Sequence, residues 1–504
     1  MNIRSPLSIF LLFVFLQPVT FAQYGTDIDG ETLLPGSSGE PTSFAYPSPF
    51  PARGGQVDWG LALSGGGFRS AAFSIGVLKA LYEQGIITQI DVISTVSGGG
   101  YASYWMYSKY DGKPGTTFGA GAFDDAVFTT NVCNLARKSE FLPLRRMFGG
   151  LFSSDDNAFR KYREAIEFTF GADDIKTRDE KRHVGEDPLL PFMAFEQQIK
   201  NGNAPYFILN TTIATDHMKG KRGDNIDRSF EITPSYRGSS LLGFADWPDN
   251  NPSVKTWCGG VALSAAAIRF KLNRKLPNYS AELPNTQEIK MYDGGFSENL
   301  GALPLIQRRM KNIVIVDAEN DAAYGFPSYK ALKAYLKDDK RKIELKVDDI
   351  DTFLDNKERK KLFDAAAVAK GSVKYPDGGE STVYYIKMSR PKTIFTSEMH
   401  EKKIWPNGKP LPEAKRSKTR PVACPAAGLT PVTKDSLYDG MVSYSRYIND
   451  KWTWRYFFKV FPYINYNFPQ LATVDQTYYR DQLEAFIALG YLEASEIEKF
   501  KPLN

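Results

Sequence analysis

The chain has 504 residues, of which 42% are hydrophobic, which allows a large buried core and excludes a largely disordered protein. Its formal net charge of +5 is too small to indicate nucleic-acid binding on its own. The length is that of about two to four domains, or of one large enzyme domain with insertions.

The first 22 residues are typical of a secretory signal peptide. Arg4 forms a short positive region, residues 7–16 form an apolar stretch too short to span a bilayer comfortably, and small residues precede a cleavage point near Ala22. An uncleaved anchor is the alternative interpretation. Residues 23–56, rich in Gly, Pro and Ser, predict an extended leader. We therefore expect a secreted or periplasmic protein, with membrane association left open.

The chain contains three cysteines, Cys133, Cys258 and Cys424. At most one disulfide can form among them, and the sequence does not say which pair forms it. No CxxC motif or Cys/His cluster indicates a zinc site, and we predict no metal and no cofactor.

A strand–helix–strand unit opens the predicted core. Residues 58–63 read as a buried strand, and after three glycines the apolar positions follow a helical period as far as Gly85. Residues 90–96 predict a second strand and residues 101–107 a second helix. Such a unit has two parallel strands and a right-handed crossover.

Downstream, strand-like runs alternate with helical ones. The pattern loosens over 131–174, and strands are expected at 205–214, 289–292 and 312–320, with a helix beginning near 261. Later residues predict charged helices (328–361), a hairpin around a Gly-rich turn (365–389) and a closing amphipathic helix. This alternation indicates an α/β fold with a mostly parallel sheet. We divide it into a core, 57–320, and a C-terminal region, 321–504, packed on that core.

The stretch LALSGGGFRS (61–70) places three glycines between a strand and a helix. A phosphate-binding loop would end in GK[ST], and a dinucleotide fingerprint would need a further glycine where Ser70 stands. Two interpretations remain: a purely structural tight turn, and an oxyanion hole made by backbone N–H groups at a helix N-terminus.

The second strand ends in TVSGGGY (95–101), which has the layout of a nucleophile elbow around Ser97. Thr95 stands where the usual first glycine would be, and an ordinary serine in a Gly-rich turn is the alternative. In a right-handed unit both strands end at the same edge of the sheet, so Ser97 is expected beside Gly66 and Gly67.

A nucleophilic serine needs a base. The three histidines, His183, His217 and His400, lie in polar or charged stretches without catalytic context. Asp293 directly follows a strand in MYDGGFSENLG, and its carboxylate is the candidate base. A second DGG at Asp377 is explained as a hairpin turn.

These motifs together resemble those of the patatin-like lipid acyl hydrolases, including the related cytosolic phospholipases. The resemblance rests on GGGFR (65–69), Ser97 in TVSGG and Asp293 in DGG, in the family's order, and covers roughly residues 57–317. It implies a three-layer α/β/α core with a mostly parallel central sheet.

The resemblance also implies the roles of the site residues. Ser97 would attack an ester carbonyl, Gly65, Gly66 and Gly67 would stabilise the oxyanion, and Asp293 would act as base in a dyad without histidine. Arg69 would orient a lipid phosphate, or else form a structural ion pair. No calcium-binding domain is seen ahead of the core, so calcium dependence is not implied.

The expected substrate is phospholipid or lysophospholipid, met at a membrane surface. Residues 141–152 combine apolar side chains with two arginines, and residues 401–420 hold seven Lys or Arg against two Glu. Both segments suit an anionic membrane, and a core-packed cap and a solvated loop are the alternatives. Three functions remain open: an exported lipid acyl hydrolase, an acyltransferase using the same acyl-enzyme, and a non-catalytic lipid- or partner-binding relative. Neither nucleic acid nor a particular oligomeric state is predicted.

Overall fold

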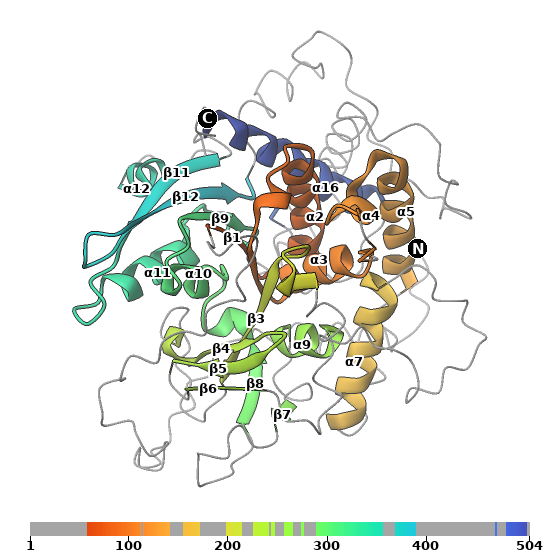
Figure 1. The fold of residues 1–504 in the computed structure, drawn as a ribbon, viewed down its shortest axis with the longest axis horizontal. Helices are drawn as coiled ribbons and strands as arrows, with labels where there is room; N and C mark the ends of the chain where they lie inside the picture. Colours follow the sequence, from red (N-terminus) through yellow and green to blue (C-terminus); the bar gives the residue numbers. More distant parts are fainter. Residues whose placement is uncertain are drawn as a thin grey trace, which may run out of the picture.

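The strands of the fold lie in one mixed sheet with helices around it (Figure 1). The computed structural model describes residues 58–110, 112–113, 115–141, 155–171, 198–213, 225–240, 243–246, 257–265, 274–276, 289–355, 368–389, 469–470 and 480–500. Two expected membrane-contact segments, 142–152 and 401–420, lie outside these residues, as do the signal, the leader, Cys424 and the three histidines.

The central strands of the sheet run parallel to one another. In spatial order they are β12 (Glu380–Lys387), β9 (Asn312–Asp317), β1 (Trp59–Leu63), β2 (Val92–Val96) and β3 (Tyr206–Ile213). The middle three are buried along almost their whole length, as expected of parallel strands covered on both faces. The predicted parallel centre and the βαβ unit are confirmed.

Antiparallel strands extend the sheet on both sides, so the sheet as a whole is mixed. Beyond β12 lie β11 (Val368–Lys374) and β10 (Glu344–Lys346), and β11 and β12 form the predicted hairpin. Beyond β3 lie β4 (Ser229–Ile232), β5 (Tyr236–Ser239) and β6 (Gly243–Asp246). Two further strands, β7 (Arg274–Leu276) and β8 (Ile289–Asp293), pair with each other, and β8 also pairs with β3.

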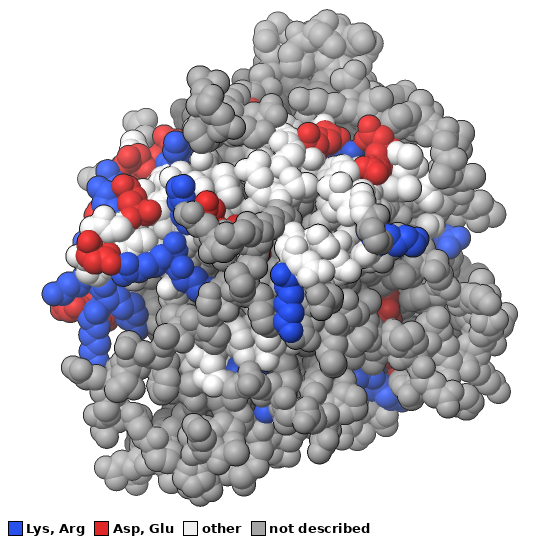
Figure 2. Space-filling model, in the orientation of Figure 1, with Lys and Arg blue, Asp and Glu red and all other residues white. Residues whose placement is uncertain are grey.

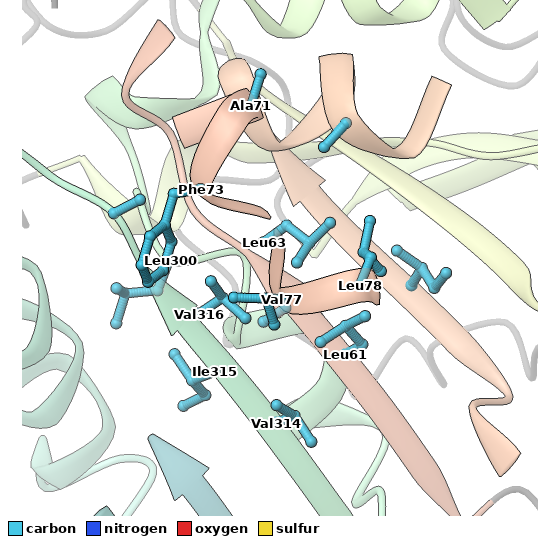
Figure 3. Packing of buried hydrophobic residues seen from close by; sticks show 14 of the residues in the cluster. Leu61, Leu63, Ala71, Phe73, Val77, Leu78, Leu300, Val314, Ile315 and Val316 are labelled. Carbon is cyan, nitrogen blue, oxygen red and sulfur yellow. The ribbon is translucent and has the colours of Figure 1, made fainter. Parts of the chain in front are cut away.

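Helices cover both faces of the sheet. Helix α2 (Gly67–Glu83) contributes Val77 and Leu78 to the cluster that contains Leu61 of β1 (Figure 3). Neighbouring residues of a strand point to opposite faces of the sheet, so Gly60 faces away from the side of Leu61. On that opposite face, Leu305 of α10 (Leu303–Gln307) packs against Gly60. The sheet therefore lies between two helical layers, which confirms the three-layer prediction.

The remaining helices surround this core. They are α3 (Gly98–Tyr107), α4 (Ala120–Phe123), α5 (Asp125–Phe141), α7 (Asp155–Phe170), α9 (Trp257–Ser264), α11 (Pro327–Lys337), α12 (Asp348–Asp355) and α16 (Arg480–Ala494). Short 3-10 turns lie at Ile87–Gln89, Ile226–Arg228, Gly294–Phe296 and Ser495–Phe500. Helices α5 and α7 lie largely within residues 131–174, where the sequence pattern predicted no regular element.

The C-terminal region is built into the core rather than appended to it. Strand β12 pairs with β9 in the central sheet, and α16 packs on α2 (Figure 1). The boundary expected at residue 320 thus falls inside one continuous sheet. Cys133 of α5 is disulfide-bonded, whereas Cys258 of α9 is buried and forms no disulfide.

Candidate active site

Ser97 lies at a strained turn between β2 and α3. Its φ of 49° is positive, a conformation that residues other than glycine rarely adopt. The Ser97 N–H donates to Ser264 Oγ over 2.9 Å and so helps to hold the turn. A side chain at Gly98 would overlap the backbone of Gly67, and one at Gly99 would overlap the Leu63 carbonyl. The predicted elbow is present, and its glycines are required by this close backbone approach.

Two strands meet end to end along β3. The last residue of β2, Val96, pairs with Asn210, and the last residue of β8, Asp293, pairs with the next residue of β3, Thr211. Because β4 occupies the other edge of β3 at Thr211, β8 continues along the edge that β2 has just left. The two strands run in opposite directions, so their C-terminal ends face each other and bring Ser97 to Asp293.

The two side chains are hydrogen-bonded. Ser97 Oγ donates to Asp293 Oδ2 over 2.9 Å. The other carboxylate oxygen, Oδ1, accepts from the Gly295 N–H over 2.8 Å, which fixes the plane of the carboxylate. Both residues are only 7% exposed, so a serine hydroxyl and a carboxylate are paired in a largely buried site. A carboxylate at this distance can take the serine proton.

The three-glycine loop lies beside the elbow. Gly66 has φ 149° and Gly67 has φ 62°, so both use backbone conformations that favour glycine. Gly67 is the first residue of α2, where the N–H groups have no acceptor within the helix and the helix dipole favours negative charge. The Gly67 backbone lies directly against Gly98, the residue after Ser97. Donors suited to an oxyanion are therefore next to the nucleophile.

Asn299 connects the glycine loop to the Asp293 turn, a role that the sequence analysis did not assign. Its backbone carbonyl accepts from the Gly65 N–H over 2.9 Å. Side chains placed at Gly65 or Gly295 would collide with Asn299 Oδ1. Asn299 follows Asp293 by six residues in DGGFSENLG, and that proximity in the motif is the one signal that could have singled it out.

Arg69 points into the protein. Its side chain is 1% exposed, and Nε and Nη2 donate to the Ala318 carbonyl over 3.3 and 3.1 Å. This contact joins the first turn of α2 to the end of β9. The geometry favours a structural role for Arg69 over the lipid-phosphate contact that the resemblance implied.

Two tyrosines lie near the dyad. The Tyr101 and Tyr162 hydroxyls are hydrogen-bonded to each other, and Tyr162 also donates to the Ala265 carbonyl over 3.1 Å. Burial raises the pKa of both hydroxyls above the usual range, and the negative charge of Asp293 raises each pKa further. Both tyrosines are therefore neutral at physiological pH and act as hydrogen-bonding groups rather than bases.

Comparison with known proteins agrees with this architecture. Residues 61–306 match the model of the patatin-like phospholipase family. Human GIVD cytosolic phospholipase A2 superposes with a TM-score of 0.53 at 10% identity, over 88% of this chain and 61% of that one. The same human enzyme in complex with methyl gamma-linolenyl fluorophosphonate gives a TM-score of 0.49 at 12% identity, over 88% and 58% of the two chains.

Other comparisons are weaker. VipD from Legionella pneumophila gives a TM-score of 0.22 at 15% identity, over 49% of this chain and 47% of that one. The sequence matches no curated protein. The uncomplexed human phospholipase shares the fold, and this chain spans about three fifths of its length. The motifs, the three-layer fold and the family match lead to one conclusion: residues 61–306 of this chain form a patatin-like phospholipase domain.

Proposed function

We propose that the protein is an exported serine lipid acyl hydrolase that cleaves fatty-acyl esters of phospholipid or lysophospholipid. The observation that carries the proposal is the 2.9 Å hydrogen bond between Ser97 Oγ and Asp293 Oδ2 beside the glycine loop. The family match supports the lipid substrate class. A non-catalytic relative would have no need to keep a buried nucleophile, a carboxylate and oxyanion donors in one place.

The geometry supports a two-step reaction. Asp293 accepts the Ser97 proton as Oγ attacks the ester carbonyl carbon, and the N–H groups of Gly66 and Gly67 stabilise the oxyanion. The expected contribution of Gly65 is dropped, because its N–H already donates to the Asn299 carbonyl. The tetrahedral intermediate collapses when Asp293 returns the proton to the leaving alcohol, which leaves an acyl-enzyme. Water then attacks the acyl carbonyl and gives its proton to Asp293. Release of the fatty acid returns that proton to Ser97.

Export is part of the proposal. Residues 1–22 have the pattern of a secretory signal, and a disulfide at Cys133 is typical of an oxidising compartment. Processing is tested by expressing the full chain in a secreting host and sequencing the N-terminus of the mature protein. A start near Gln23 supports export, and an intact Met1 in the cytosol contradicts it.

We further propose peripheral contact with the membrane that holds the substrate. Among the residues that the structure describes, no helix combines the length and the apolar character needed to cross a bilayer. Figure 2 shows charged side chains of both signs gathered over α11, α12 and the β11–β12 hairpin. Ion pairs such as Lys333–Asp351 and Lys346–Asp348 join some of these charges. This mixed-sign face is a poor match for an anionic surface.

The nucleophile is tested by covalent labelling. An alkyl fluorophosphonate should modify the mature wild-type protein, and peptide mass spectrometry should place the adduct on Ser97. Asp377→Asn is a matched control, because Asp377 also stands in a DGG turn. That turn joins β11 to β12, and Asp377 forms an ion pair with Arg309, which follows α10. We expect that variant to label at the wild-type rate. An adduct on another serine, or none on folded protein, contradicts the assignment.

A further inference from the structure

A buried cluster of charges lies at the end of β9, behind the glycine loop. The segment VDAEND (316–321) follows this strand and carries three acidic residues. Asp317 and Glu319 are fully buried and Asp321 is 7% exposed. Ionised carboxylates are costly to bury without partners, so this cluster must be held by specific contacts.

The cation of this cluster comes from the C-terminal region. Lys387, the last residue of β12 and 1% exposed, places Nζ 2.9 Å from Asp317 Oδ2, 3.5 Å from Glu319 Oε1 and 3.4 Å from Asp321 Oδ2. Burial lowers the pKa of the Lys387 ammonium, but the three carboxylates together raise it above its usual value. Lys387 therefore stays charged and links all three acids.

Neutral donors complete the cluster. The Tyr385 hydroxyl donates to Asp317 Oδ2 over 2.5 Å, and the Ser328 hydroxyl donates to Glu319 Oε2 over 2.6 Å. The Gly325 and Phe326 N–H groups each donate to Asp321 over 2.8 Å. Every acid of the segment thus has a hydrogen-bond donor as well as the ammonium, and the segment has one fixed conformation.

The same segment supports the glycine loop. Ala318, between Asp317 and Glu319, donates its N–H to Ser64 Oγ over 2.7 Å. Its carbonyl accepts from Arg69 and lies so close to Gly66 that a Cβ there would be 2.8 Å from it. Both the N–H and the carbonyl of Ala318 therefore contact the glycine loop or the residues that flank it.

From these contacts we infer that Lys387 is a positioning residue for the oxyanion loop. The inference rests on the proposed function and adds a residue outside the family-matched segment 61–306. Lys387 forms ion pairs with the three acids, and these acids fix the backbone segment that contains Ala318. The Ala318 carbonyl in turn accepts a hydrogen bond from Arg69 and packs against Gly66. Loss of the ammonium leaves three crowded carboxylates, which repel one another and displace Ala318. A shift of about 1 Å in donor position can cost about 10²-fold in rate.

The mild test is Tyr385→Phe, which removes one hydrogen bond to Asp317 and keeps the ring. Its matched control is Tyr236→Phe, because the Tyr236 hydroxyl donates to Glu231, in the buried Arg308–Glu231 ion pair between β4 and the end of α10. Both variants should lose similar thermal stability. We expect kcat for a soluble short-chain ester to fall about three- to tenfold in Tyr385→Phe, with KM within twofold, and to stay at the wild-type value in Tyr236→Phe.

The strong test is Lys387→Met beside Arg308→Met, each of which removes the cation of a buried ion pair. We expect kcat to fall about 100-fold in the first variant and less than threefold in the second, measured well below both melting temperatures. If Lys387→Met does not fold, the comparison of kcat between Tyr385→Phe and Tyr236→Phe is the test of the inference.

Two contradictory results remain distinguishable. Wild-type activity with equal kcat values in Tyr385→Phe and Tyr236→Phe overturns the positioning role and leaves the hydrolase intact. A folded wild type that cleaves no ester and takes up no fluorophosphonate overturns the proposed function, and the inference with it.

Discussion

At the scale of single residues, the site depends on contacts that hold backbone rather than on many polar side chains. Ser97 keeps a positive φ because its N–H donates to Ser264 and the three residues after it are glycines. Strain of this kind costs about 1–3 kcal/mol and persists only where the surroundings enforce it. Around Ser97 this conformation is enforced by the glycine loop on one side and by β3, through Ser264, on the other.

Arg69 is expected to act on every substrate alike. Its guanidinium is buried on the Ala318 carbonyl, so Arg69→Ala should loosen the oxyanion loop whatever head group is present. We predict about 10- to 100-fold lower kcat/KM on phospholipid and on a neutral glycerol ester, with equal ratios to wild type. A selective loss on phospholipid would contradict this and restore a phosphate-binding role.

Glu298 makes stability depend on pH. Burial raises the pKa of its carboxyl from 4.5 to about 6, although the backbone N–H groups of Leu300, Leu303 and Ala302 lower it in part. A raised pKa means that the proton binds more tightly in the folded chain. The stabilisation by this proton is full below pH 4.5 and is lost as pH rises through 6, a change of about 2 kcal/mol.

Glu298→Gln tests this sign, because the amide cannot ionise. Urea unfolding at pH 4.5, 5.5 and 7 should show the variant gaining stability relative to wild type as pH rises. A difference that stays constant over this range, or that moves the other way, contradicts the assignment.

At the scale of elements, α2 and α16 pack with their backbones in contact. A side chain at Gly76 would overlap the Ile487 carbonyl, and one at Gly490 would overlap the Phe73 carbonyl. The two glycines thus let the closing helix lie directly on the helix whose first residue, Gly67, faces Ser97. Through this contact α16, although far along the chain, supports the helix that begins in the glycine loop.

Gly490→Ala should therefore destabilise the protein by about 1–3 kcal/mol, the usual cost of overpacking, despite the higher helix propensity of alanine. Gly100→Ala is the matched control, because a Cβ at that helical position would lie 3.4 Å from Val261 with room to fit. Denaturant unfolding of both variants measures the effect. Equal stability of the two variants would mean that the crossing tolerates a side chain.

The βαβ unit and the later central strands could be predicted from the sequence. Helices α5 and α7, strands β4 to β6 and the points where the elements meet could not. The run WGLAL, the three glycines and the helical period after them predicted β1, the loop and α2. The same reasoning placed Asp293 after a strand but gave no sign that β8 meets β2 head-on along β3, because strand direction is set by distant pairing. Asn299 and Lys387 were missed because each acts through tertiary contacts.

At the scale of the whole molecule, the catalytic layer depends on residues well beyond the matched family segment. Residues 61–306 contain Ser97, Asp293 and the glycine loop. Later residues supply β9 and β12 beside β1, the Lys387 ammonium behind the loop and the helix that covers α2. Described strands from both parts of the chain therefore share one sheet, and activity should be measured on the full chain.

Fatty-acid release from mixed phospholipid vesicles is the measurement that tests the central claim most directly. Mature wild-type protein is compared with Ser97→Ala, Asp293→Asn and the control Asp377→Asn. The account predicts release by wild type and by Asp377→Asn, and a loss of at least about 10³-fold in the other two, with folding unchanged. Activity that survives in folded Ser97→Ala or Asp293→Asn would contradict the Ser97–Asp293 dyad.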